Sequence, residues 1–285
     1  MLRIIILFGF TYFFMMLHAK GDISKYINMK YSYLSFSMIF LMGFLTLYQL
    51  IQWARGDKRK DHNHNHDHDH GHDHSHDEDT ILKKVFTYTM MLIPIITGIF
   101  LPAATLDSTI VKAKGFHFSF IDNDTDQYAN HQILRPDASP YYDKIAYNQM
   151  DKNDLKKYGS ENRIVLDDKH YFRALESIYN HPGNFIDKKV VLKGFAYRTD
   201  DIENNQLFVL RFGIIHCIAD AGVYGMLVEF PKDVKSQIHK DEWLQVEGTL
   251  ETTYYQPFKE NIPYLKVTKW EEIPKPKDPY VYRQY

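Results

Sequence analysis

A tract of alternating histidines is the most chemically distinctive part of the sequence. Residues 61–79 read DHNHNHDHDHGHDHSHDED, so that 19 residues hold eight histidines and seven carboxylates. Neutral imidazole binds Zn, Ni and Cu well, and nearby carboxylates supply further oxygen ligands or accept the second ring N–H. The tract lacks apolar residues and cannot fold alone, so we expect it to bind metal without a fixed geometry. The candidate ligands are His62, His64, His66, His68, His70, His72, His74 and His76.

The same composition also fits a solvated linker without a metal role, because an assignment of this kind is only compositional. The tract suits a metal buffer or sensor loop better than a catalytic site. Zinc is the one cofactor that these residues suggest.

A second candidate cluster runs from Arg211 to Asp220. It includes His216 and Cys217, and Cys217 is the only cysteine in the chain. Imidazole and thiolate are good zinc ligands, but adjacent residues of a regular strand face opposite sides, so both bind one ion only if the strand bends. The alternative is a small buried thiol beside a surface-paired histidine. Arg211 and Asp220 are expected to pair with each other or to bind a partner.

Known catalytic motifs are not found. The sequence has no Gly-rich phosphate loop, no Ser-His-Asp signature and no HExxH. A Cys-His nucleophile at residues 216–217 lacks a visible third residue. We therefore predict no catalytic residues, and an envelope enzyme using His216, Cys217 and Asp220 is the least favoured alternative.

Three apolar stretches flank these candidates and predict membrane helices. They span about residues 2–18, 33–53 and 85–106, and a bilayer core of about 30 Å needs roughly 20 helical residues. Pro94 and Gly98 in the third stretch are tolerated where neighbouring helices satisfy the backbone. The first stretch also fits a signal peptide cleaved after Leu17-His18-Ala19, but its bulky end favours an uncleaved helix.

Flanking basic residues predict the orientation. The loop between the second and third stretches carries Arg55, Lys58, Arg59, Lys60, Lys83 and Lys84, against Lys20, Lys25 and Lys30 in the first loop. By the positive-inside rule, the histidine loop is cytoplasmic and the C-terminal domain is extracellular, in a multi-pass protein of a bacterial cell membrane.

The segment 107–160 is predicted as a polar linker. Its run Asp122–Asp126 resembles the start of a calcium loop, but Gln127 and Ile133 occupy the positions of the required Gly and Glu, so we expect no calcium site. Residues 167–179 then predict a helix, with Asp167 or Asp168 accepting its first N–H groups.

Five strand-like runs predict an all-β domain over residues 161–285. An insertion at 231–241 follows the third run, and this order matches an OB-fold-like five-stranded barrel. Gly194, Gly225 and Gly248 fall where such a barrel coils sharply. A net charge of −2 and the lack of a basic stripe argue against a nucleic-acid partner. The runs are 189–198, 206–217, 226–230, 243–255 and 263–273.

The order of short motifs along nearly the whole chain resembles the YcgQ-type family of bacterial two-component permease subunits. The N-terminal pieces are Lys25-Tyr26-Ile27-Asn28, the histidine tract and Leu101-Pro102. The C-terminal pieces are residues 164–168, 194–198, 211–220, 225–228 and 246–250. Family members commonly carry a Cys-Cys pair where this chain has His216-Cys217, which weakens a two-thiol metal site.

The resemblance implies a partner, a separate polytopic permease subunit encoded by a neighbouring reading frame. We therefore expect an accessory membrane subunit, linked to divalent metal through its histidine tract. The second and third apolar stretches carry no acid, which favours an accessory role over an ion relay. The main alternative is a membrane-anchored metal-binding or sensing protein that acts without a permease. In both cases the lipid bilayer is a partner.

Overall fold

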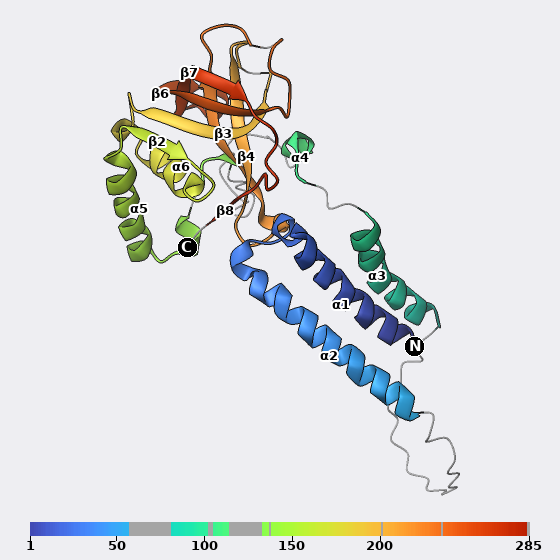
Figure 1. Cartoon of the computed structure of the whole chain (residues 1–285). Coiled ribbons are helices and arrows are strands. Elements are labelled where there is room, and N and C mark those ends of the chain that lie inside the picture. The colour runs from blue at the N-terminus through green and yellow to red at the C-terminus, as the bar shows by residue number, and fades with distance from the viewer. Residues whose placement is uncertain are drawn as a thin grey trace, which may run out of the picture. The chain divides into compact units, whose positions relative to one another are not determined.

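The computed structural model describes residues 1–56, 81–101, 105–113, 133–136, 138–200, 202–234 and 236–283. The chain divides into two compact units, Met1–Ala104 and Thr105–Tyr285 (Figure 1). The predicted histidine tract and the Asp122–Asp126 run both lie outside the described residues.

The first unit consists of three helices, α1 (Leu2–Lys20), α2 (Ser32–Gly56) and α3 (Ile81–Phe100), with α1 contacting both others. Two helical stretches, Leu2–Lys20 and Met29–Gly56, are long and apolar enough to cross a membrane. The short helices η1 (Asp22–Lys25) and η2 (Met29–Tyr31) join α1 to α2.

The third apolar helix is shorter than predicted. α3 ends at Phe100 instead of Leu106, and its apolar part is Val85–Phe100. Pro102 explains the early end, because proline disfavours helical geometry in the residue before it. Gly98 allows α3 to approach α1, since an added Cβ would overlap the ring of Phe13.

The second unit is built around a ring of five strands: β3 (Lys189–Tyr197), β4 (Gln206–Ile214), β5 (Gly222–Glu229), β6 (Trp243–Tyr255) and β7 (Glu260–Glu272). The pairing order is β3-β4-β5-β7-β6 and back to β3. The β5–β7 pair is parallel, and the other four pairs are antiparallel.

Three further strands extend this sheet, and each pairs parallel to a ring strand. β1 (Ile133–Leu134) pairs with β5, β2 (Arg163–Leu166) with β3, and β8 (Val281–Tyr282) with β4. The remaining short helices are α4 (Ser108–Ala113), η3 (Ser139–Tyr141), η4 (Pro182–Asn184), η5 (Ile218–Asp220) and η6 (Gln256–Phe258).

The prediction of a β domain is confirmed in part: the ring of five strands is present, and helices pack against the sheet. Helix α6 (Tyr171–Asn180) contacts strands of the sheet, and α5 (Lys144–Gly159) packs on α6 (Figure 1). The second unit is therefore a mixed sheet domain with helices against it. α5 lies in the segment predicted as a linker, where its polar sequence shows little apolar periodicity. It is held by Tyr158, which is buried in the larger apolar cluster, and by an ion pair between Asp154 and Arg173 of α6 at 2.5 Å.

Two apolar clusters fill the second unit. The larger one joins the aliphatic side chains of the sheet, such as Val190 and Val246, to Leu175 and Ile178 of α6. The smaller one is aromatic, and in it the rings of Phe195 and Phe212 stack with centroids 5.3 Å apart. Strand β4 contributes to both clusters, so nearly all of its residues are buried.

Candidate functional site

The middle of β4 carries one charged residue among apolar neighbours. Arg211 belongs to the run QLFVLRFGI, and its side chain is 1% exposed. A guanidinium is costly to bury unless its N–H groups and its charge find partners. The surroundings of Arg211 therefore define the most constrained polar site of the second unit.

Arg211 has partners on every side. Its Nη1 donates to a carboxylate oxygen of Asp168, and its Nη2 donates to the carbonyl oxygen of Tyr280 at 3.0 Å. Its Nε lies 3.4 Å from the carbonyl oxygen of Pro279. The rings of Tyr171 and Trp243 lie 5.7 and 5.6 Å from the guanidinium carbon, which is cation–π distance.

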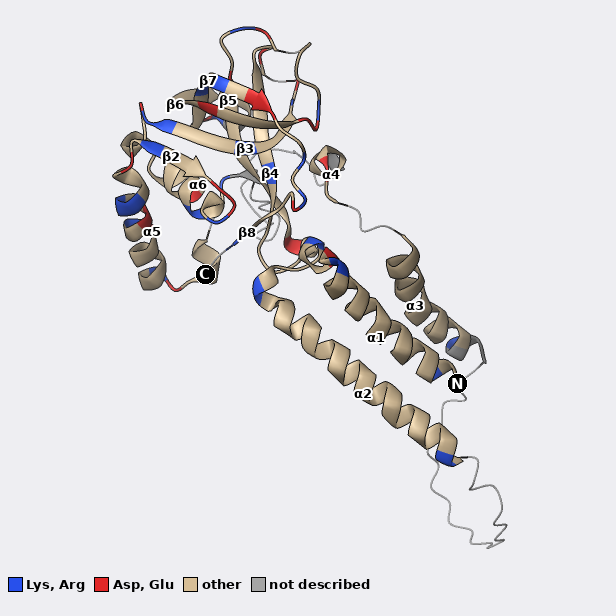
Figure 2. Cartoon of the chain, viewed as in Figure 1, with Lys and Arg blue, Asp and Glu red and all other residues tan. Residues whose placement is uncertain are grey.

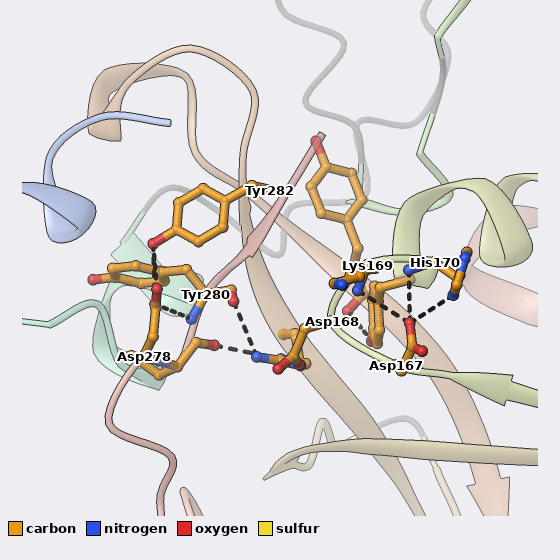
Figure 3. A network of polar contacts seen from close by, with 11 residues as sticks. Asp167, Asp168, Lys169, His170, Asp278, Tyr280 and Tyr282 are labelled. Atoms are coloured by element: carbon orange, nitrogen blue, oxygen red, sulfur yellow. Dashed lines mark hydrogen bonds and ion pairs between the residues drawn. The ribbon is translucent and has the colours of Figure 1, made fainter. Parts of the chain in front are cut away.

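The turn between β2 and α6 contains two aspartates with different partners: Asp167 binds backbone N–H groups of the turn, and Asp168 binds Arg211. Asp167 accepts hydrogen bonds from the backbone N–H groups of Lys169 and His170, at 3.0 and 2.8 Å (Figure 3). Partial burial raises the pKa of Asp167, but these bonds and the His170 ring outweigh it, so the pKa lies below its usual value. Asp168 is thereby left to face Arg211.

The C-terminal segment supplies the carbonyl groups that hold Arg211. Asp278 accepts from the backbone N–H of Tyr280 at 3.1 Å and from the hydroxyl of Tyr282 at 2.8 Å (Figure 3). The hydroxyl of Tyr280 in turn accepts the backbone N–H of Leu106 at 2.8 Å. Tyr280 thus contacts both Arg211, through its carbonyl oxygen, and Leu106 near the start of the second unit, through its hydroxyl.

A pocket of about 430 Å³ opens beside the Asp168–Arg211 pair. Its polar lining combines two acids with two cations, Arg211 and Lys193, while Ile273, Pro274 and Pro276 contribute to its apolar wall. The described lining contains no serine, cysteine or histidine that would act as a nucleophile or a base.

The loop after β4 contains the predicted His216 and Cys217. The carboxylate of Asp220 accepts the backbone N–H groups of Ile215, His216 and Cys217 at 2.9 to 3.2 Å, and it lies 2.9 Å from Nδ1 of His216. Asp220 thus organises this loop, while Arg211 pairs with Asp168 instead of with Asp220. In the described part of the chain, no group of three His, Cys, Asp or Glu residues is arranged to hold a metal ion.

The ion pair between Glu176 and Arg283, in which both side chains are buried, was not predicted from the sequence. Glu176 of α6 lies 3.8 Å from Arg283, and the same carboxylate accepts from the backbone N–H of Ala138 at 2.7 Å and the hydroxyl of Tyr147 at 3.1 Å. These contacts fasten the segment before α5 to α6. An acid inside an otherwise amphipathic helix was the only sequence signal for this pair.

Comparison with protein-family models shows two matches that together cover most of the chain. Residues 2–117 match the DUF1980 N-terminal domain, and residues 141–283 match the DUF1980 C-terminal domain. The second match contains Asp168, Arg211 and the whole strand ring.

Two full-length relatives support the same assignment. The UPF0703 protein YcgQ of Bacillus subtilis is 52% identical over 288 residues, with 100% of both chains covered. A Streptococcus mutans protein named "Putative two-component membrane permease complex subunit" is 34% identical over 290 residues, again with 100% of both chains covered. That name and the two long apolar helices both indicate membrane association. The chain therefore belongs to the DUF1980 family, together with YcgQ.

Proposed function

We propose that this protein is an accessory, non-enzymatic subunit of a two-component membrane permease. The observation that carries the proposal is the full-length similarity to the Streptococcus mutans protein that bears this name. Three helices are few for a carrier built from internal repeats, and α2 and α3 carry no acid for an ion relay. Both features favour a subunit that assists a separate polytopic permease.

The membrane arrangement proposed here has three spans. α1 and α2 have the length and composition for this, and α3 would cross in a thinned or locally adjusted bilayer. Basic residues then favour a cytoplasmic histidine loop and an extracellular second unit. Protease added to intact cells should cleave the second unit, and cleavage only after lysis would contradict this orientation.

The strand ring is further proposed to form an OB-type barrel. Its support is the pairing order, in which the first ring strand pairs with the second and the fourth, and the third pairs parallel to the fifth. Glu229 and Lys266 are register partners across that parallel pair, and neither side chain is buried. Cysteines at both positions in a Cys217→Ser background should cross-link with a short bifunctional thiol reagent, and an open sheet would leave them unlinked.

Co-purification tests the permease assignment. The tagged full chain, solubilised from its native membrane in mild detergent, should bring down the polytopic protein encoded by the neighbouring reading frame. A variant with the eight tract histidines changed to Ser is the matched control and should retain this partner. Absence of any polytopic partner from the wild-type preparation would reject the permease role in favour of a protein that acts alone.

A link to divalent metal is proposed from the eight alternating histidines. Zinc binding requires neutral imidazole, whose usual pKa is about 6.5, so affinity should fall below that pH. The eight-Ser variant should lose most zinc binding to the full chain while its second unit stays folded. Unchanged zinc tolerance and unchanged transport in cells carrying this variant would reduce the tract to a linker.

A further inference from the structure

A pocket lies between the three helices of the first unit, at the end where α1 and α3 begin. Its volume is about 450 Å³, and all three helices line it. The polar side chains at its rim include Arg3 of α1, Gln49 of α2 and Lys83 of α3. Arg3 reaches across to α3, where its Nε lies 3.4 Å from the hydroxyl of Tyr88.

The wall of this pocket is apolar. Ile6 and Leu7 lie one turn further along α1 from Arg3, and Met91 lies further along α3. A ligand that fits such a site has an anionic end for the two cations and a hydrocarbon part for the wall. Phosphate on a hydrocarbon chain meets both requirements.

The charge distribution of the described helices favours an anion at this end. Arg55 lies in the last turn of α2, beyond Gln49 of the pocket, and Figure 2 shows blue, basic segments at this end of the helices. Within residues 1–56 and 81–101 the single acid is Asp22 at the opposite end, where it pairs with Lys25 at 2.6 Å. Among the described residues, the charged side chains at the pocket end of these helices are all basic.

We propose that this pocket binds an anionic phospholipid, with the headgroup phosphate on Arg3 and Lys83 and an acyl chain along Ile6, Leu7 and Met91. The bilayer supplies this ligand at high local concentration, and basic pockets between membrane helices at a helix end suit such headgroups. The proposal requires only that the helices lie in a membrane, so it is independent of the permease partner.

Native mass spectrometry of the full chain tests the proposal. The delipidated protein is offered phosphatidylglycerol and phosphatidylcholine with identical acyl chains, and it should retain phosphatidylglycerol preferentially. The Arg3→Gln/Lys83→Gln variant should lose this preference, by about fivefold for each cation removed. The Lys20→Gln/Lys30→Gln variant removes two cations from the opposite end and should keep the preference.

Several outcomes would overturn the site. Equal retention of phosphatidylglycerol by the Arg3→Gln/Lys83→Gln variant, or an equal loss in the Lys20→Gln/Lys30→Gln variant, would show general electrostatic attraction. Displacement of the lipid by inorganic phosphate at matched ionic strength would show a site for soluble anions instead. If the double variant fails to fold, Met91→Trp keeps both cations and fills the apolar wall; it should also lower retention, and unaltered retention would reject the pocket.

Discussion

The carboxylate of Asp168 is the ion-pair partner of the buried guanidinium of Arg211, although the two residues lie on different elements. The side chain of Asp168 is 75% exposed and that of Arg211 is 1% exposed. The two charges therefore differ in solvation: water solvates the carboxylate of Asp168, whereas the buried guanidinium of Arg211 is stabilised only by contacts with the protein. Removing either partner should have different consequences.

Arg211→Met should destabilise the second unit by roughly 3 kcal/mol, because it removes the donors to the carbonyls of Pro279 and Tyr280 together with the ion pair. Asp168→Asn should cost only about 1 kcal/mol, since its carboxylate is largely solvated. Urea unfolding of the full chain in detergent, followed by tryptophan fluorescence, measures both. The exposed Arg163–Glu247 pair is the control, and Arg163→Gln should change little. Equal losses from Asp168→Asn and Arg211→Met would contradict the asymmetry.

Gly225 should tolerate no side chain. A Cβ there would lie 2.1 Å from the carbonyl oxygen of Val209, and backbone atoms cannot move aside as a side-chain tip can. Gly225→Ala should therefore destabilise the strand ring by about 2 kcal/mol or more. Gly183→Ala is the matched control, since its added Cβ meets nothing within 4 Å. Thermal melts of the two variants check this, and equal melting temperatures would show that β4 and β5 can separate at no cost.

Tyr158 should make folding sensitive to alkaline pH. Burial, and next the nearby Asp154 carboxylate, raise the pKa of this tyrosine from 10.0 to about 12. Between about pH 10 and 12 the unfolded chain releases the phenol proton while the folded chain keeps it, so the free energy of unfolding falls as pH rises. Tyr158→Phe should weaken this fall.

The same substitution should also stabilise the protein near neutral pH, by about 1 kcal/mol, because the buried hydroxyl of Tyr158 has no hydrogen-bond partner among the described residues. Urea midpoints at pH 7 and 11 check both effects. Tyr254→Phe is the control, since its side chain is 58% exposed. A Tyr158→Phe protein less stable than wild type at pH 7 would indicate that the hydroxyl is satisfied.

Asp220 should protect the only cysteine. Its carboxylate accepts three backbone N–H groups of the loop that carries Cys217, so Asp220→Ala should release this loop. Alkylation of the full chain, followed by mass spectrometry, should proceed severalfold faster in that variant. Asp200→Ala, in an exposed turn, should leave the rate unchanged. An unaltered rate in Asp220→Ala would mean that other contacts hold the loop.

Runs rich in Val, Ile, Leu and aromatic residues, bounded by polar or turn residues, were enough to locate the ring strands. The run Trp243–Tyr255 was predicted with the bounds that the structure shows, and β3 differs from its prediction by one residue at its end. Burial does not alternate along β3 or β4, so the signal that located them is their local content of β-branched, leucine and aromatic residues. The run 206–217 was predicted too long, because the carboxylate of Asp220 captures the N–H groups that would have continued β4.

The sequence by itself determined the apolar helices, the order of the ring strands and the family. Tertiary structure alone decided the partner of Arg211, because Asp168 lies 43 residues away and meets it only after α6 packs against the sheet. It also decided that α5 is a helix of the second unit. Ion pairs between distant residues, such as Asp154–Arg173, leave no periodic signal in a sequence, since their energy depends on which elements fold side by side.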